Sequence, residues 1–360
     1  MNAAGPLDRL RGLLKQQELD ALFVSTPENR RYLSGFDGSA GCLIITQSDA
    51  ILATDFRYVE QAGRQAPDYR VVRTGVESKW FPTLLSELGV RRVGFEAQDL
   101  TVAQYNQLTE SLGKGNGVSL VPTQGMAERL RAVKTPEERG LIQRAIDAAD
   151  TAFSRVVSTM RPGITEQELA WELEKAMREL GAEKMSFDII VAAGPNGALP
   201  HHHPSERVIR TGEPVVIDMG ARYQGYCSDM TRTVVLGDGG ETFRRVFDTV
   251  LAAQETAIAA VEAGMTGEQA DSLARRVIQE AGYGDNFGHG LGHGVGLAVH
   301  EFPRLGLRSA DVLEEGMVFT IEPGVYLSGW GGVRIEDMVV LEGGRAGVLT
   351  RAPKKEKAGE

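Results

Sequence analysis

Asp218 and Asp229 are two carboxylates on one predicted hairpin, where they could bind a cation together. They lie in the stretch VVIDMGARYQGYCSDMTRTVV, residues 215–235, where a glycine-bearing turn separates two apolar, β-branched runs. A turn centred on Tyr223 and Gln224 would place the two aspartates opposite each other, with Cβ atoms about 4.5–5.5 Å apart. Carboxylates that close repel unless a cation lies between them or one is protonated. The alternative is two surface aspartates near a turn, where Asp is common.

A second stretch, TIEPGVYLSGWGGVRIEDMVV at residues 320–340, repeats this design with Glu322 and Glu336. A turn centred on Gly329 places the two glutamates opposite each other on a second predicted hairpin. Between the hairpins, the segment FGHGLGHGVGLAVHE carries His289, His293 and His300. Four carboxylates and an imidazole suit a pair of divalent cations with a bridging water.

This constellation resembles the pita-bread metallopeptidases, which include methionine aminopeptidase, aminopeptidase P, prolidase and creatinase. The matching segments are ALPHHH at residues 198–203, GHGLGHGVGL, IEPGVY and VRIED. The chain departs from the family pattern GLEVHE at Ala298, a position that is not a metal ligand in the family. The resemblance implies five metal ligands: Asp218, Asp229, His293, Glu322 and Glu336.

The resemblance also implies a role for each ligand. Asp218 is expected to bind one metal, Asp229 and Glu336 to bridge both, and His293 and Glu322 to complete opposite ends. Two metals that share a water would lower its pKa and produce a bridging hydroxide. Glu322 would take the proton of that water and pass it to the leaving nitrogen.

All six histidines lie between residues 201 and 300, which favours a shared role near the metals. By resemblance, His201 binds substrate, while His289 and His300 contact substrate and stabilise the tetrahedral oxyanion. His202 and His203 are interpreted as part of a polar loop, with a basic loop that meets the substrate carboxylate as the alternative.

Two further side chains near the predicted ligands each have two interpretations. Arg334 precedes Glu336 by two residues on the same strand face, and it either forms an ion pair with a ligand carboxylate or contacts substrate. Tyr226 either points into the site or packs in the core. The sequence leaves both alternatives open.

The family resemblance predicts an Xaa-Pro dipeptidase (prolidase), a metallopeptidase that hydrolyses the bond before proline in small peptides. Xaa-Pro aminopeptidase (aminopeptidase P) is the alternative, and a non-catalytic peptide-binding relative is a remote one. Creatinase needs no metal, and the complete ligand set argues against it. Two divalent ions are expected. Manganese, cobalt and zinc all suit a carboxylate-rich site with one His, and manganese is the first expectation.

The chain is long enough for two domains. Residues 1–125 alternate helical and strand patterns, which predicts an α/β domain. Residues 134–350 carry three helix starts, at Thr135, Thr165 and Thr266, each with Glu or Gln three residues later. They are expected to form an α+β pita-bread domain with pseudo-twofold symmetry, and residues 351–360 a disordered charged tail.

The first domain resembles the creatinase and prolidase amino-terminal domain, which is non-catalytic and helps to form a homodimer. The stretch NRRYLSGFDGSAG, residues 29–41, is interpreted as a glycine-bearing loop. Its Arg30 and Arg31 are expected to reach the neighbouring subunit's site, where a cation could grip a substrate carboxylate.

Composition limits the partners and the cellular location that the protein can have. A net charge of −10 and a pI near 5.3 argue against nucleic acid as the main partner. The sequence shows no signal peptide and no apolar run long enough to span a membrane. Cys42 and Cys227 do not form a disulfide framework, and cytoplasmic residence is expected.

Overall fold

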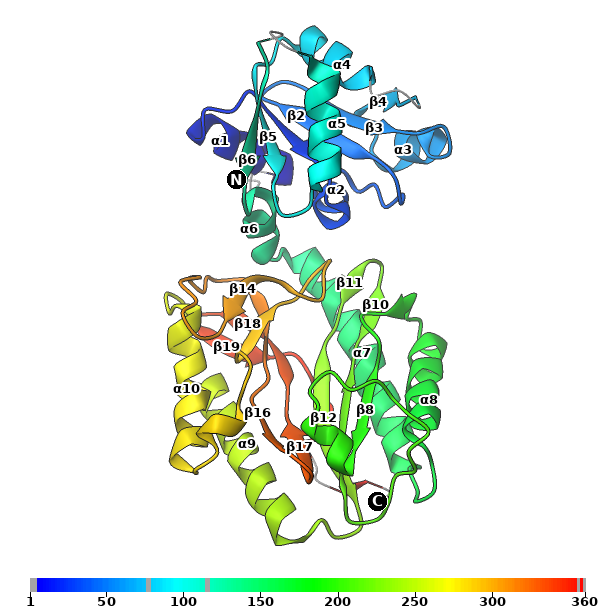
Figure 1. The fold of residues 1–360 in the computed structure, drawn as a ribbon, viewed down its shortest axis with the longest axis vertical. Coiled ribbons are helices and arrows are strands. Elements are labelled where there is room, and N and C mark those ends of the chain that lie inside the picture. Colours follow the sequence, from blue (N-terminus) through cyan, green and yellow to red (C-terminus); the bar gives the residue numbers. More distant parts are fainter. Residues whose placement is uncertain (1–4, 76–78, 114–116, 355–356, 359–360) are drawn as a thin grey trace. The chain divides into compact units, whose positions relative to one another are not determined.

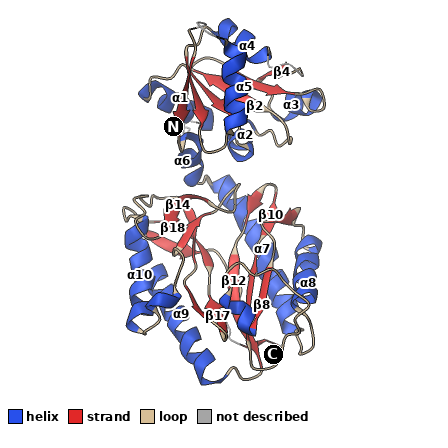
Figure 2. Cartoon of the chain, in the orientation of Figure 1, coloured by secondary structure: helices blue, strands red, loops and turns tan. Residues whose placement is uncertain are grey.

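The computed structural model describes residues 5–75, 79–113, 117–354 and 357–358. Its contacts divide the chain into two compact units, Met1–Arg131 and Ala132–Glu360. Helices and strands of each unit are shown in Figure 1 and, by type, in Figure 2. In the described residues, no helix is both long enough and apolar enough to span a membrane.

The amino-terminal unit is built around a six-stranded sheet of order β4-β3-β2-β1-β5-β6. Apolar side chains pack between this sheet and its helices in two clusters, one centred on Leu22 and Leu43, the other on Phe23 and Phe81. The elements are α1 (Pro6–Gln16), β1 (Ala21–Val24), α2 (Pro27–Ser34), β2 (Cys42–Thr46), β3 (Ala50–Thr54), α3 (Val59–Gln65), β4 (Arg70–Arg73), α4 (Trp80–Leu88), β5 (Arg92–Glu96), α5 (Val102–Leu112), β6 (Ser119–Thr123) and α6 (Met126–Ala132).

The predicted loop at residues 29–41 is wrong in its first part, because α2 continues to Ser34 and ends at Gly35, whose φ is +77°. The expectation that Arg30 reaches a neighbouring site is also wrong. Its side chain is buried and donates to the backbone oxygens of Gly38 and Gly41. Those carbonyls need a donor where the chain turns away from water, and the guanidinium supplies it.

The second unit contains two related halves that face each other across its sheets. The first half consists of α7 (Pro136–Ser158), α8 (Glu166–Glu179), β7 (Lys184–Met185), β8 (Ile190–Ala193), the 3-10 helix η1 (Gly194–Ala198), β9 (Pro214–Met219), β10 (Ala221–Tyr223), β11 (Tyr226–Cys227) and β12 (Met230–Leu236). The second half consists of α9 (Gly240–Ala260), α10 (Gly267–Glu280), η2 (Gly284–Asn286), β13 (Gly292–Gly294), β14 (Glu301–Leu305), β15 (Val318–Ile321), β16 (Gly324–Leu327), β17 (Gly331–Arg334), β18 (Asp337–Glu342) and β19 (Arg345–Val348). Helices α7 and α8 cover one side and α9 and α10 the other (Figure 1).

The helix starts confirm the predicted capping boxes and the pseudo-twofold relation between the halves. The side chains of Thr135, Thr165 and Thr266 each accept from the backbone N–H three residues later. Thr165 bridges to Val208, and Thr266 bridges to Val312 in the same way. The second helix of each half, α8 or α10, therefore begins beside an equivalent segment of its own half.

The residues after Arg351 differ from the disordered tail that the sequence predicts. Strand β20 (Lys357–Ala358) pairs with β12, and Lys354 forms an ion pair of 2.7 Å with the buried carboxylate of Asp337. Asp337 also binds the buried Arg232 at 2.7 Å. A buried charge needs partners, so this network draws the end of the chain onto the core. Residues 355–356 and 359–360 lie outside the described residues.

Candidate metal centre

The first predicted hairpin forms with a register two residues away from the expected one. Asp218 lies opposite Thr231 rather than Asp229, because the tight turn is at Gln224 and Gly225. A slip of two residues keeps every side chain on its face, whereas a slip of one would have reversed it. Asp218 and Asp229 therefore still share one face as diagonal neighbours.

The second hairpin has the predicted register. Ile321 lies opposite Asp337, and Gly324 lies opposite Arg334, so Glu322 and Glu336 face each other between these two pairs. Both glutamates lie at short breaks, where β15 gives way to β16 and β17 gives way to β18. The breaks free the two side chains to turn toward the aspartates of the first hairpin.

The structure brings the predicted ligands together. Ligand atoms of Asp229, His293 and Glu336 all lie within 4.8 Å of one another. His293 Nε2 lies 3.2 Å from Glu322 Oε1 and 3.6 Å from Asp229 Oδ2. Asp218 joins the same cluster electrostatically, since its charge raises the pKa of both Asp229 and Glu336.

The electrostatics of this cluster fit a bound cation. Burial, together with the neighbouring carboxylates, raises the pKa of Asp229 and of Glu336 well above their usual values. Burial alone would also raise the pKa of Glu322, but the hydrogen bond and charge of His293 lower it to about 2. Among the described residues, Asp218 Oδ1 and Glu336 Oε1 are buried with no hydrogen-bond partner. Buried acceptors without donors, in a ring of like charges, suit divalent metal ions.

Arg334 lies at the edge of the cluster, and its side chain is 4% exposed. It forms an ion pair with Asp218 Oδ2 and donates to the hydroxyls of Tyr326 at 2.8 Å and Thr231 at 3.0 Å. Of the two interpretations of Arg334, the structure shows the ion pair with a predicted ligand.

The remaining histidines occupy different surroundings. His289 Nδ1 lies 2.8 Å from the Gly290 oxygen, and Nε2 lies 2.9 Å from the Tyr326 hydroxyl, so both ring nitrogens have partners. His300 is exposed, and its ring packs edge-on against His293 at 4.2 Å. His201 is also exposed, and it lies close enough to His300 to affect the pKa of that ring.

The other two histidines of the ALPHHH segment, His202 and His203, differ in exposure to solvent. His202 is directed into the protein, with Nε2 2.8 Å from the buried carboxylate of Glu166. This position fits the polar-loop interpretation for His202, while His203 is exposed. Tyr226 donates to Glu138 at 2.9 Å and packs beside the apolar cluster of Ile142 and Val295.

Sequence reasoning did not select two threonines that contact predicted metal ligands, nor Tyr326, which contacts two predicted substrate-binding residues. Thr231 donates to Glu336 Oε2 at 2.7 Å, Thr320 donates to Glu322 Oε1 at 3.1 Å, and Tyr326 links Arg334 to His289. Each threonine lies two residues from a predicted ligand on an extended segment, and therefore on the same face. That alternation was a signal in the sequence; Tyr326 stood in the IEPGVY segment without a separate signal.

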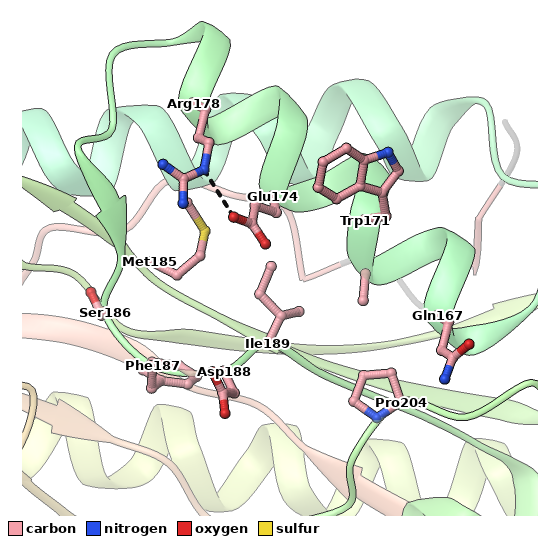
Figure 3. A pocket seen from close by; sticks show the side chains of 11 residues that line it. Gln167, Trp171, Glu174, Arg178, Met185, Ser186, Phe187, Asp188, Ile189 and Pro204 are labelled. Carbon is pink, nitrogen blue, oxygen red and sulfur yellow. Dashed lines mark hydrogen bonds and ion pairs between the residues drawn. The ribbon is translucent and has the colours of Figure 1, made fainter.

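The metal cluster lies apart from a surface cavity of about 590 Å³ beside α8. Figure 3 shows Trp171, Glu174 and Arg178 of this helix lining the cavity across from Ile189 and Pro204. None of the predicted metal-ligating or substrate-binding residues lines this cavity.

Comparisons with known proteins agree with this architecture. The model of metallopeptidase family M24 matches residues 140–342, and the model of the creatinase/prolidase N-terminal domain matches residues 6–133. An Xaa-Pro dipeptidase from Pyrococcus furiosus is 37% identical over 350 residues, which cover 97% of this chain and 98% of the relative.

Solved structures give the same result. The Xaa-Pro dipeptidase from Bacillus anthracis superimposes with a TM-score of 0.94 and 42% identity, over 98% of each chain. An X-Pro aminopeptidase from Thermotoga maritima superimposes with a TM-score of 0.87 and 36% identity, over 98% of this chain and 99% of that chain.

Proposed function

The chain belongs to metallopeptidase family M24, and we propose that it is an Xaa-Pro dipeptidase, which hydrolyses the bond before proline in dipeptides. The observation that carries this proposal is the cluster of Asp229, His293 and Glu336 with Glu322 and Asp218 beside it. Full-length similarity to proteins named Xaa-Pro dipeptidases supports the substrate class. A non-catalytic relative would have no need of this cluster.

We propose that two divalent cations occupy the cluster, and that the preferred metal is manganese. Divalent cations bound there would lower the pKa of the attacking water and so supply a nucleophile near neutral pH. The buried oxygens Asp218 Oδ1 and Glu336 Oε1, which accept from no donor in the part of the chain that the structure describes, support this assignment. The residues that would hold the cations are Asp218, Asp229, His293, Glu322 and Glu336.

The protein's own side chains have distinct tasks in this proposal. The Glu322 carboxylate accepts a proton from the attacking water and returns it to the leaving nitrogen. Thr320 and His293 contact Glu322 Oε1 and fix the orientation of the carboxylate. His201 and His300 are both exposed, where they can bind the substrate and donate to the tetrahedral oxyanion.

His289 contributes through its neighbour Tyr326. Because both ring nitrogens already have partners, His289 is tied to Tyr326 and, through it, to Arg334 and Asp218. Direct donation from His289 to the substrate would require one of these bonds to exchange. The chain of contacts instead holds the Asp218 carboxylate in place from outside the cluster.

An Xaa-Pro aminopeptidase is the second candidate, because the Thermotoga maritima structure carries that name. A dipeptidase must recognise a free carboxylate one residue after the scissile bond, whereas an aminopeptidase must leave that end open. Arg334 and Arg30 bind other groups within the protein, so Arg31 and the exposed His203 of the ALPHHH segment remain the candidates for that carboxylate.

The deciding experiment compares an Xaa-Pro dipeptide, its carboxyl-terminal amide and an Xaa-Pro-Xaa tripeptide, after metal removal and readdition of Mn²⁺, Co²⁺ or Zn²⁺. We expect the dipeptide to be the best substrate and the amide to have a sharply higher KM. Equal cleavage of all three would identify an open site and an aminopeptidase. No cleavage with any metal would contradict the enzyme assignment.

We also propose that the protein is a cytoplasmic homodimer in which the partner's amino-terminal unit approaches the site. Its segment after α2 supports this, since Asp37 and Ser39 are exposed while Arg30 holds the backbone beneath them. Sedimentation equilibrium should give twice the chain mass. A monomer with full dipeptidase activity would contradict the proposal.

A further inference from the structure

The segment that carries His201 is bound from inside the protein by one buried carboxylate. This segment, residues 193–205 and here called the histidine loop, runs from the end of β8 through η1 to Ser205. Glu166, the first residue of α8, lies directly behind it and is 0% exposed. A fully buried carboxylate is costly unless it is well hydrogen-bonded, so its partners indicate what it is for.

Among the described residues, every hydrogen bond to the Glu166 side-chain oxygens comes from the histidine loop. Oε1 accepts from the Ala193 backbone at 2.8 Å and the Asn196 amide at 2.9 Å. Oε2 accepts from Ser205 Oγ at 2.6 Å and Ser205 N at 3.0 Å, and it lies 2.8 Å from His202 Nε2. One carboxylate therefore holds the start, the middle and the end of the same loop.

The bonds also make this carboxylate an anion. Burial alone would raise the pKa of Glu166, but the bonds from Ala193, Ser205, His202 and Asn196 outweigh burial and lower it. Hydrogen bonds to a charged acceptor are stronger than neutral ones, so an ionised Glu166 grips the loop more firmly than an amide of the same shape would.

Helix capping does not account for Glu166. The capping box of α8 is complete without it, since Thr165 accepts from the Glu168 backbone and Glu168 accepts from the Thr165 backbone. A carboxylate in the first turn would also interact favourably with the helix dipole while exposed to solvent. Exposed first-turn glutamates do so elsewhere in the chain, whereas Glu166 is turned inward.

The opposite face of the loop is fixed as well. Gly197 packs against Gly332 of β17, so closely that a Cβ on Gly332 would lie 2.1 Å from the Gly197 oxygen. Strand β17 ends at Arg334, which binds Asp218. The loop is thus held between Glu166 on one side and a strand of the metal centre on the other, and its His201 is exposed.

We propose that Glu166 is a positioning residue that places His201 for substrate binding, with His202 as the link between the carboxylate and its neighbour in the chain. This inference rests on the proposed function, because it assigns a partner to a histidine of the proposed substrate site. Glu166 itself touches no substrate.

The test is a double-mutant cycle with Glu166→Gln, His201→Ala and the pair, measured with an Xaa-Pro dipeptide and Mn²⁺. Glutamine has nearly the same shape, but its single carbonyl oxygen cannot accept from both the Ala193 N–H that faces Oε1 and the Ser205 N–H that faces Oε2. We expect Glu166→Gln to lower kcat/KM by about 10- to 100-fold, as small misplacements of a binding group do, with bound metal unchanged. In the His201→Ala background the same change should cost less than about threefold, because partners that act together are not additive.

The matched control is Glu268→Gln at the start of α10. Glu268 is exposed, and its carboxylate accepts from the Arg308 backbone at 3.2 Å, so the substitution is the same but no histidine loop depends on it. We expect wild-type kinetics. If Glu166→Gln folds poorly, Ser205→Ala removes one bond to the carboxylate and should shift kcat/KM in the same direction by a smaller factor.

Hydrogen exchange provides a readout that does not depend on activity. In Glu166→Gln, exchange should rise within residues 193–205 and stay at the wild-type level in β9 and β15. Independent losses in the double mutant, or faster exchange throughout the second unit, would overturn the proposal in favour of a general structural role. Inactivity of the wild-type protein on every Xaa-Pro peptide would overturn the proposed function, while the exchange result would still stand.

Discussion

The two halves of the catalytic unit build similar carboxylate pairs, yet they hold their histidine-bearing segments in different ways. In the first half, Glu166 at the start of α8 accepts hydrogen bonds from the loop that carries His201. In the second half, Arg275 of α10 donates to the backbone oxygens of Phe287 at 2.9 Å and His289 at 2.7 Å. The histidine-bearing segment is therefore held by a carboxylate in the first half and by a guanidinium in the second half.

The difference follows from how closely the chain approaches each helix start. Gly267 occupies in α10 the position that Glu166 occupies in α8, directly after the N-cap threonine. A Cβ at Gly267 would lie 2.0 Å from the Arg304 oxygen, so no side chain fits there. The anchor of the second half therefore lies one turn later, where Asp271 orients Arg275 through bonds of 2.6 and 2.9 Å. A close backbone contact thus decides where a half can place its anchor.

The largest expected effect comes from removing one carboxylate from each half, with Asp229→Ala and Glu336→Ala. Each should reduce activity by more than about 100-fold, since even an outer partner of a metal ligand typically costs about 10- to 100-fold. Metal content by mass spectrometry and turnover should fall together in both variants. Retention of half the wild-type rate with two metals bound would remove Asp229 or Glu336 from the ligand set. Asp229→Asn and Glu336→Gln control for shape.

The second effect compares the exposed histidine with the bonded one. His300→Ala and His289→Ala should both lower turnover with metals still bound, by up to about 10²–10³ for loss of an oxyanion donor. The loss at His289 should be the smaller, because both of its ring nitrogens have protein partners. Tyr326→Phe should reproduce much of it. A parallel loss of metal would instead place these histidines among the ligands.

The same comparison shows how much of the site could be predicted from sequence. The prediction that Asp218 and Asp229 lie on the same face of the hairpin was correct, although the predicted register was wrong by two residues. Side chains alternate between the two faces of a strand, so a shift of two residues leaves each on its face. Glu322 and Glu336 were correct in register because glycines confine the turn near Gly329. Sequence patterns thus predicted which carboxylates meet, together with the capping boxes that begin the helices.

The anchors could not be predicted in this way, since each depends on backbone groups distant in sequence. No sequence pattern singled out Glu166, whereas Arg30 was expected to reach a neighbouring subunit's site and Lys354 to lie in a disordered charged tail. In the structure, Glu166 binds the histidine loop, Arg30 binds the oxygens of Gly38 and Gly41, and Lys354 binds Asp337. Buried polar groups need hydrogen-bond partners, and in these three places a charged side chain supplies them. No local sequence pattern shows which polar groups will be buried.

A smaller effect is expected from the anchor of the second half. Arg275→Ala removes the donors to Phe287 and His289 and leaves the 1%-exposed carboxylate of Asp271 without its cation. We expect a loss of about 1–3 kcal/mol in the free energy of unfolding, as for a buried acceptor that loses its partner. Turnover should fall about tenfold through His289. Arg275→Lys, which keeps the charge but not the two-pronged geometry, should be intermediate. An unchanged turnover would show that α10 does not control the position of His289.

The smallest effect is a pH dependence of the free energy of unfolding that arises in the first half, through Glu166. Its folded-state pKa is lowered because the hydrogen bonds from Ala193, Ser205, His202 and Asn196 outweigh the burial that would raise it. A lowered pKa stabilises the fold above the unfolded-state value of about 4.3, and this stability is lost as pH falls through the folded-state pKa. The difference in free energy of unfolding between wild type and Glu166→Gln should therefore be full at pH 7 and shrink below about pH 4. Denaturant titrations at both pH values measure it, with Glu268→Gln as the control that lacks a buried carboxylate. A difference that stayed constant with pH would mean that Glu166 holds the loop by its shape and not by its charge.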